Sequence, residues 1–474
     1  METNDKPLFK KIAQGYTFKI VMLIFLSLLL LIPLAMIRGL INERNRTAAS
    51  AEADIMEAWG SQLMEAGPVI AVPGVRTEQI RTRTERDGEK IEEVKKNFTL
   101  VITPQKLNIN AGFTTEIRKR GIFSVPLFSG ELALSGTFDP AGALASLSPN
   151  DELSFAQAEL IIVLSSQKGI RKIDRALWNN RELFFQPGNQ GVNIIQRDNI
   201  YKDMMYREDK RRITWDSGTG GSGIYAAIPG FTGAAKADFD ITIAIQGGQL
   251  VRFMPVGQDT HVEISTDWAS PSFQGSFLPG SSTITDAGFD AVWDISYLSR
   301  DIPLFWKNED NDFRDYSASM FGVNFFRAID TYSLNTRAVK YAILFLIVPF
   351  LTLFLLEVFT KKRIHPVPYL LSGIANIIFY LLLLSLSEQM QFYCAYLLAA
   401  LGVTIMMTLY ARSLLPSWNK SWYMGLVIII SYVLLYAVLN AESYALLIGS
   451  IGAFMVVALV MFITRKLEWY NYEA

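Results

Sequence analysis

Six apolar stretches, each long enough to cross a lipid bilayer, constrain this chain more than any other feature of its sequence. The hydrocarbon core of a bilayer requires about 20 mostly apolar residues in a helix. One stretch lies near the N-terminus, and five follow one another toward the C-terminus. The sequence therefore predicts an integral membrane protein with a single N-terminal anchor helix and a C-terminal five-helix transmembrane bundle. The stretches are residues 18–37, 341–359, 367–386, 392–411, 423–439 and 444–463.

Lysine and arginine residues gather at alternate ends of these stretches. They precede the first stretch, follow the second, separate the fourth from the fifth and follow the sixth, whereas the loops 387–391 and 440–443 contain none. Because short cytoplasmic loops are enriched in lysine and arginine, we expect both termini to be cytoplasmic. The predicted segments are a cytoplasmic N-terminus (1–17), transmembrane helix 1 (18–38), an extracytoplasmic β-rich domain (39–337), transmembrane helices 2–6 (338–466) and a cytoplasmic tail (467–474).

The first apolar stretch also has features of a cleaved signal peptide. It has a basic start, and Ala49-Ser50-Ala51 resembles a cleavage site. However, its apolar run is too long for a signal peptide, and these small residues lie well beyond its end. We therefore expect a retained anchor; cleavage would leave five spans without changing the sidedness of the others.

The long segment between the anchor and the bundle has the pattern of an all-β domain. Residues 44–64 have helical spacing and continue the anchor, and Gly67-Pro68 is expected to end that helix. The densely charged residues 77–96 are expected to form a solvated hairpin tip or loop. Short alternating runs separated by glycine and proline predict an antiparallel β-sandwich. The predicted strands are 98–102, 131–138, 159–164, 239–245, 249–254 and 261–265.

A Phe-x-Gly triplet occurs at residues 128–130, 231–233 and 273–275, and each triplet is followed by Phe-Asp. The spacing is unequal, whereas true repeats keep a constant period. Two interpretations stay open at this point: a duplicated β unit that forms two packed sandwiches, or coincidence in a chain rich in phenylalanine and glycine.

Composition argues against several functional classes. The net charge of −1 does not provide the concentrated basic surface that nucleic acid requires. The two histidines, His261 and His365, are too few for a His-rich metal site, and the single cysteine, Cys394, lies in an apolar stretch. The sequence contains neither a Gly-x-x-x-x-Gly-Lys-Ser/Thr phosphate loop nor a His-Glu-x-x-His motif. We therefore expect no cofactor, no metal site and no catalytic residues, and predict that the protein is not an enzyme.

Polar residues in the predicted spans are the remaining candidates, because such residues are costly in lipid and often functional. Asn376 lies near the middle of the third span, and Thr404 and Thr408 share one face of the fourth. Glu357 lies near the cytoplasmic end of the second span, and Glu388 lies just outside the third. Two interpretations stay open. The asparagine and the hydroxyls join helices by hydrogen bonds while the glutamates sit at headgroup depth, or Asn376 lines a transport path and the glutamates relay protons.

Several long strings of residues point to a known family. Residues 268–279 begin with Trp268 and contain Phe273 and Gly275, and further matching strings occur at 337–343, 365–371 and 379–388. In their order and topology these strings resemble the CreD family of bacterial inner-membrane cell envelope integrity proteins. The family commonly has a histidine after the Ser-Glu pair, where this chain has Gln389. This departure makes an essential Glu–His pair less plausible.

The resemblance implies an inner-membrane protein that maintains the cell envelope and takes part in an envelope stress response, with no established reaction. We expect a non-enzymatic protein in the lipid bilayer whose periplasmic β domain binds an envelope protein, peptidoglycan or a lipid-linked component. The alternative is a transporter or channel-like protein for a lipid-linked or small envelope molecule. The candidate functional residues are Asn376, Glu357 and Glu388 in the bundle and Trp268, Phe273 and Gly275 in the outer domain.

Overall fold

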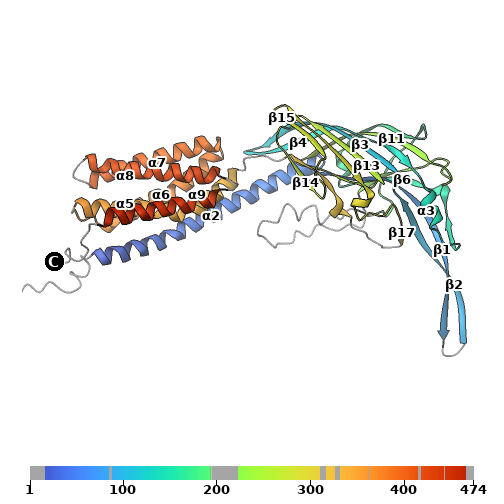
Figure 1. The fold of residues 1–474 in the computed structure, drawn as a ribbon, viewed down its shortest axis with the longest axis horizontal. Helices are drawn as coiled ribbons and strands as arrows, with labels where there is room; N and C mark the ends of the chain where they lie inside the picture. Colours follow the sequence, from blue (N-terminus) through green and yellow to red (C-terminus); the bar gives the residue numbers. More distant parts are fainter. Residues whose placement is uncertain are drawn as a thin grey trace, which may run out of the picture. The chain divides into compact units, whose positions relative to one another are not determined.

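Figure 1 shows the computed structural model of the chain. It divides into two compact units, one made of residues 1–49 and 329–474 and the other of residues 50–328. The predicted tail 467–474 and all but the last two residues of the predicted N-terminus 1–17 lie outside the described residues. The structure describes residues 16–84, 88–192, 194, 222–309, 316–325, 331–360, 362–414, 418–441 and 444–465.

Six of the described helices are long and apolar enough to cross a membrane, and each contains one of the six predicted stretches almost completely. The first helix ends at Trp59, whereas the sequence predicted that it would extend to residue 64. Gly67-Pro68 does not end this helix but lies inside the first strand, so the predicted stop signal was wrong; the helix ends at the Trp59-Gly60 step. The helices are α2 (Tyr16–Trp59), α5 (Thr331–Thr360), α6 (Pro366–Ser387), α7 (Phe392–Leu414), α8 (Trp418–Asn440) and α9 (Ala445–Thr464).

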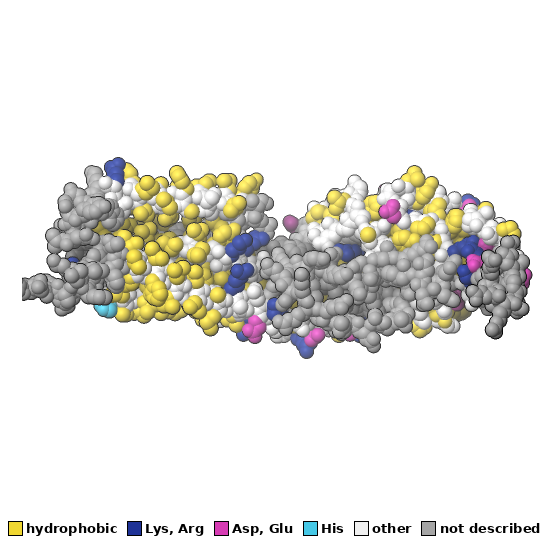
Figure 2. All heavy atoms as spheres, turned by 90° about the horizontal axis from the view of Figure 1, so that it is seen from below, with side chains coloured by type: hydrophobic (Ala, Val, Ile, Leu, Met, Phe, Trp, Pro, Cys, Tyr) yellow, Lys and Arg dark blue, Asp and Glu magenta, His cyan; other side chains and the backbone are white. Residues whose placement is uncertain are grey.

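The helical unit has apolar side chains both inside and outside. Leu346, Leu383 and Leu435 belong to a buried cluster shared by α5, α6 and α8. Large apolar side chains such as Phe454 and Met461 on α9 are exposed. Figure 2 shows hydrophobic side chains covering one face of these helices, with lysine and arginine toward the ends of the covered belt. An apolar outer surface is what lipid contact requires, because the bilayer core offers no water to solvate polar groups.

The other unit contains two β-sheets (Figure 1). The ten-stranded sheet has the order β14-β18-β12-β1-β6-β10-β9, with β2 and β5 also on β1 and β17 on β2. The eight-stranded sheet has the order β15-β16-β13-β3-β4-β11-β7-β8. The strands are β1 (Leu63–Thr84), β2 (Gly88–Ile102), β3 (Lys106–Arg120), β4 (Phe123–Phe138), β5 (Asp151–Leu153), β6 (Glu159–Leu164), β7 (Ile170–Trp178), β8 (Arg181–Glu182), β9 (Gln186–Pro187), β10 (Gly223–Ala227), β11 (Ala237–Gly248), β12 (Leu250–Met254), β13 (Asp259–Thr266), β14 (Pro271–Gly275), β15 (Ser281–Thr285), β16 (Gly288–Ser296), β17 (Phe305–Glu309) and β18 (Phe321–Phe325).

All six predicted strands are present, as parts of β2, β4, β6, β11, β12 and β13. The described parts of the charged segment, residues 77–84 and 88–96, belong to the paired strands β1 and β2, with Thr77 opposite Lys95; residues 85–87 lie outside the described residues. Pairing is mainly antiparallel, as predicted, but β1 runs parallel to β12 and β13 runs parallel to β3. The sequence could not show these two exceptions, because they join segments that are far apart in the chain. One short helix, α3 (Ala141–Ala145), follows β4.

The main hydrophobic cluster of the β unit includes buried side chains from both sheets, such as Ile161 and Phe253 from one and Leu134 and Ile243 from the other. The three Phe-x-Gly triplets lie in different settings, inside β4, between β10 and β11, and inside β14. They therefore do not mark equivalent positions of a duplicated unit.

Candidate functional site

Glu357 of α5 is the most deeply buried of the described carboxylates in the helical unit, with 2% of its side chain exposed. Lys19 of α2 forms an ion pair with one carboxylate oxygen. The hydroxyl of Tyr369 on α6 donates to the other oxygen at 2.8 Å. The Lys19 ammonium also donates to the backbone carbonyl of Ile364 at 3.0 Å. Both oxygens of Glu357 are thus engaged, and the group ties α2 and α6 to α5.

Glu388, just after the C-terminal end of α6, has a similar arrangement further along α2. The guanidinium of Arg44 on α2 lies 3.8 Å from its carboxylate. The hydroxyl of Tyr332 on α5 donates to the same oxygen at 3.3 Å. Beside it, the buried Asn335 amide donates to the Ser387 hydroxyl at 2.8 Å. Glu388 therefore also connects α2 with α5 and α6.

The two ion pairs are separated by most of the thickness of a membrane. Lys19 and Arg44 lie on the same helix, and the 25 residues from 19 to 44 correspond to about 38 Å of helix. A bilayer measures about 30 Å across its hydrocarbon core and about 40 to 45 Å with the headgroup layers. This separation fits one ion pair in each headgroup layer. Charges at this depth cost far less than charges in the hydrocarbon core.

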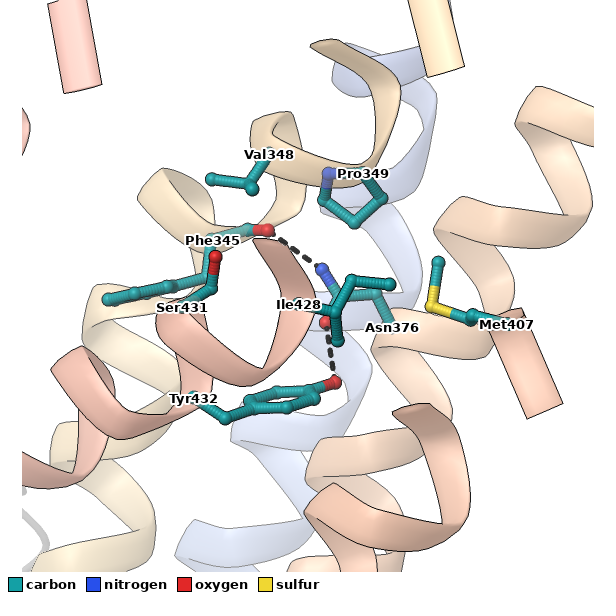
Figure 3. A pocket seen from close by; sticks show the side chains of 8 residues that line it. All are labelled: Phe345, Val348, Pro349, Asn376, Met407, Ile428, Ser431 and Tyr432. Atoms are coloured by element: carbon teal, nitrogen blue, oxygen red, sulfur yellow. Dashed lines mark hydrogen bonds between the residues drawn. The ribbon is translucent and has the colours of Figure 1, made fainter. Parts of the chain in front are cut away.

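Asn376 of α6 lies in the middle of the bundle next to a proline in α5 (Figure 3). Pro349 has no N–H, so the carbonyl of Phe345, four residues earlier, loses its helical hydrogen-bond donor. The Asn376 amide donates to this carbonyl at 2.9 Å. The side chain thus replaces the missing backbone donor, as backbone carbonyls freed in membrane helices require.

The carbonyl oxygen of the Asn376 side chain continues the network to α7 and α8. It accepts a hydrogen bond of 3.2 Å from the Tyr432 hydroxyl. The Tyr396 hydroxyl in turn donates to the backbone carbonyl of Tyr432 at 2.6 Å. A nearby tyrosine, Tyr380, is buried, and its hydroxyl has no hydrogen-bond partner in the described part of the chain. Asn376 therefore joins three helices directly and a fourth through Tyr432.

The cavity beside Asn376 has a volume of about 10 Å³, which is room for about one water molecule. Figure 3 shows the mainly apolar side chains that line it. The nearby hydroxyls bond to their own helices, Thr408 to the carbonyl of Thr404 and Ser431 to that of Val427. The proposed transport path through Asn376, Thr404 and Thr408 would need a much larger polar cavity than this one.

Two of the three candidates in the β unit pack against aromatic rings, and the third is a glycine that lies close to a backbone carbonyl. The ring of Trp268 packs edge-on against Phe325, with centroids 6.2 Å apart. Phe273 of β14 packs against Phe289 and Trp293 of β16, so it joins the two sheets. Gly275 has φ +102°, and a Cβ there would lie 2.2 Å from the carbonyl oxygen of Met320. Packing therefore accounts for these residue types.

Two buried carboxylates of the β unit escaped the sequence analysis. The side chain of Asp151 is fully buried and pairs with Arg76 at 2.8 Å and with Lys307 at 2.5 Å. Burial would raise the pKa of Asp151, but these hydrogen bonds lower it to about 2. Glu65 of β1 is also fully buried, but neither of its carboxylate oxygens has a hydrogen-bond partner in the described part of the chain. Burial raises the pKa of Glu65 well above its usual range.

The sequence offered one signal for Glu65 and none for the tyrosines that bond to Glu357 and Asn376. A glutamate between Met64 and Ala66, in a run that is otherwise apolar, marks an inward position only once the strand is known. Lys19, Tyr369 and Tyr432 became relevant only through contacts between distant helices. Among the described residues, no group of three or more histidine, cysteine, aspartate or glutamate side chains could hold a metal ion.

A family profile and a curated relative both match nearly the whole chain. The profile of the family described as "Inner membrane protein CreD" matches residues 15–470. The chain is 28% identical to the Inner membrane protein CreD of Escherichia coli (strain K12) over 448 residues, which is 94% of this chain and 92% of that protein. A solved structure from Parabacteroides distasonis covers 69% of this chain and 59% of its own chain at 10% identity, and its TM-score of 0.22 is too low to support an argument.

Proposed function

This chain belongs to the CreD family of inner membrane proteins, and we propose that it is a non-enzymatic protein that supports the integrity of the cell envelope. In this proposal both termini are cytoplasmic and residues 39–337 are periplasmic. The β unit binds an envelope component, namely a protein, peptidoglycan or a lipid-linked molecule, and the helices hold it at the membrane.

The pairing of the candidate polar groups in the helical unit is the observation that supports this proposal. Glu357 bonds to α2 and α6, Asn376 bonds to α5 and α8, and Glu388 bonds to α2 and α5. Side chains that hold helices together in this way are not free to bind a transported molecule. The β unit is then the part of the protein with surface available for a partner.

A reporter experiment tests the proposed sidedness. Alkaline phosphatase, which is active only outside the cytoplasm, should be active when fused after residue 200 and inactive when fused after residue 474. The opposite pair of activities would contradict the proposed topology and, with it, a periplasmic binding function.

Complementation in a strain that lacks its own family member separates the proposed function from transport. Replacing residues 65–325 by a short linker should abolish complementation, because the β unit binds the partner. The variants Asn376→Leu and Glu357→Gln should complement in proportion to the amount of protein that reaches the membrane. If these two variants instead lost function at an unchanged protein level, the transport alternative would be favoured.

A crosslinking experiment tests for a partner directly. Photo-crosslinking residues placed at exposed positions of the β unit should give a discrete product in intact cells. The same residues placed on the lipid-facing side of α9, for example at Phe454, provide the matched control. An absence of any product specific to the β unit would contradict the binding proposal.

A further inference from the structure

The two sheets of the β unit are open, so each has edge strands with unpaired backbone N–H and C=O groups. The terminal strands are β14, β9, β5 and β17 in the ten-stranded sheet and β15 and β8 in the eight-stranded sheet. The parts of β2, β3 and β7 that extend beyond their neighbours are also unpaired on one side, and their sequences contain several charged residues. Exposed edges can pair with strands of other chains, and proteins usually protect them with proline, with charged side chains or by keeping the strand very short.

Five of these six edges have such protection. Strands β8 and β9 contain two residues each, and β5 contains three. Strand β14 begins with a proline and is half-buried, and β17 contains a lysine and a glutamate. The protecting residues are Arg181, Glu182, Pro187, Glu152, Pro271 and Lys307.

Strand β15 is the exception among the described edges (Figure 1). Its sequence, Ser-Ser-Thr-Ile-Thr, contains neither proline nor charge, and all five residues are exposed. Ile284 within the strand is 52% exposed, and Leu278 just before it is 72% exposed. The strand pairs with β16 on one side only. It therefore presents an uncharged backbone edge together with uncovered apolar side chains.

The outer face of the sheet next to this edge is acidic. In β16, Phe289 and Ala291 are buried, so Asp290 between them points outward. Thr283 lies opposite Asp290, and Glu263 of β13 lies on the same outer face, opposite Val292. Asp286 lies in the turn between β15 and β16. None of these three carboxylates forms an ion pair or a hydrogen bond within the part of the chain that the structure describes.

We propose that β15 is a strand-addition site for an extended segment of a partner protein that has lysine or arginine at alternate positions. Strands lie about 5 Å apart, so a basic side chain on an added strand has its Cβ about 10 Å from that of Asp290, within reach of a lysine. The intervening positions are apolar, because they face the side on which Ile284 lies. Backbone pairing supplies affinity and alternate side chains supply specificity, as in other strand additions.

A second copy of this chain is a poorer occupant of this edge than a basic segment. If two β15 strands paired with each other, the added strand would contribute only serine, threonine and isoleucine and no cation to neutralise Asp290. The Asp290 residues of the two copies would lie three strand spacings apart, about 15 Å. A basic partner segment instead places a cation within reach of Asp290.

This inference rests on the proposed binding function of the β unit, and disulfide trapping on the full chain in detergent tests it separately. The protein is prepared as Cys394→Ser with Thr283→Cys. The probes are ten-residue peptides with one central cysteine and identical flanking residues. One peptide alternates lysine and valine, one has the same composition in blocks, and one alternates glutamate and valine. A protein with Glu182→Cys on the protected edge β8 is the matched control.

The alternating lysine peptide should form a disulfide at position 283 at least tenfold faster than the other two peptides and tenfold faster than it does at position 182. Adding Glu263→Gln and Asp290→Asn should reduce that rate several-fold, because the attraction to the acidic face is lost. Equal rates for the alternating and block peptides would overturn the proposal. A disulfide-linked dimer that forms faster than the peptide adduct would also overturn it, in favour of a second copy. Neither outcome depends on whether the reporter and complementation tests succeed.

Discussion

The helical unit and the β unit bury carboxylates in different ways. Glu357, in the helical unit, is bonded through both oxygens to groups from two other helices. In the β unit, Asp151 is paired just as fully, by Arg76 and Lys307. Glu65 of the same unit has no partner among the described residues. The difference lies in the partners: Glu357 and Asp151 each have a cation beside them, and Glu65 has none among the described residues.

A β unit with a large core can retain one unpaired acid because the acid can take up a proton. Burial raises the pKa of Glu65, which favours the neutral form, and this form is much less costly to bury than the anion. This comparison predicts that breaking a charge pair costs most in the helical unit. It also predicts that the effects in the β unit depend on pH in opposite senses for Asp151 and Glu65.

The largest effect is expected from Lys19→Met. This substitution leaves the Glu357 carboxylate buried without its cation, and breaking one side of a buried pair typically costs about 3 to 5 kcal/mol. The measurement is the free energy of unfolding of the full chain, obtained by titrating mixed micelles with SDS. A loss below about 1 kcal/mol would mean that the pair is solvated and that the contrast with Glu65 is wrong.

The matched control is the double variant Lys19→Met with Glu357→Gln. It removes both charges and keeps a side chain that can accept from Tyr369, so it should recover most of the lost stability. A double variant as unstable as Lys19→Met alone would show that Lys19 acts through its contact with the Ile364 carbonyl.

The next effect is expected from Asp151→Asn in the β unit. The pKa of Asp151 is lowered to about 2, whereas an exposed aspartate titrates near 3.9. The carboxylate therefore adds about 2 kcal/mol of stability above about pH 4, which is lost as the pH falls toward 2. Thermal unfolding followed by tryptophan fluorescence should show a lower Tm for the variant at pH 7. The difference in Tm between the wild type and the variant should become smaller near pH 3. A difference in Tm that does not change with pH would contradict the pairing of Asp151 with Arg76 and Lys307.

Glu65→Met should raise the stability of the β unit, whereas Asp151→Asn lowers it. The substitution removes two buried oxygens that lack partners, and it should stabilise the β unit by about 1 to 2 kcal/mol at pH 8. Because the folded-state pKa of Glu65 is raised, the native protein binds the extra proton. Its stability therefore falls as the pH rises above about 4.3, the usual pKa of an exposed glutamate.

The pH profile separates this explanation from a simple packing effect. The advantage of Glu65→Met over the wild type should grow from pH 4.5 to pH 8, measured as the difference in Tm. The conservative variant Glu65→Gln should show the same loss of pH dependence with a smaller increase in Tm. An advantage that does not change with pH would mean that Glu65 is solvated or paired in the native state.

The sequence predicted the helices of this protein better than its strands, for a physical reason. A membrane helix satisfies its own backbone hydrogen bonds, so the apolar run 392–411 marks α7 (Phe392–Leu414) almost to its ends. A strand depends on partners that are far away in the chain. Residues 249–254 were recognised as a strand, but their parallel pairing with β1 was not foreseeable. The continuation of β1 across Gly67-Pro68 was missed because a turn signal outweighed the apolar run around it.

The candidate site shows the same limit. Asn376 and Glu357 stand out in the sequence because polar residues are rare in membrane spans. Their partners Tyr432 and Tyr369 do not stand out, since tyrosine is common in membrane helices near their ends. The role of Asn376 could be predicted from the sequence only in part. Pro349 indicates that a backbone carbonyl in α5 lacks its donor, but the residue of α6 that faces this carbonyl can be identified only from the packing of the helices.

The smallest effect is expected from Asn376→Leu, which tests whether the helical unit pairs its neutral groups as strictly as its charges. The substitution deprives the Phe345 carbonyl of its donor and the Tyr432 hydroxyl of its acceptor. Hydrogen bonds between membrane helices contribute about 0.6 kcal/mol on average and rarely more than about 1.7, so a loss of about 1 kcal/mol is expected in the SDS titration. Adding Pro349→Ala should reduce this loss, because an alanine N–H can bond the same carbonyl within α5. If the two substitutions were additive instead, Asn376 would not serve as the substitute for the missing proline donor, and its hydrogen bond with Tyr432 would account for its place in the bundle.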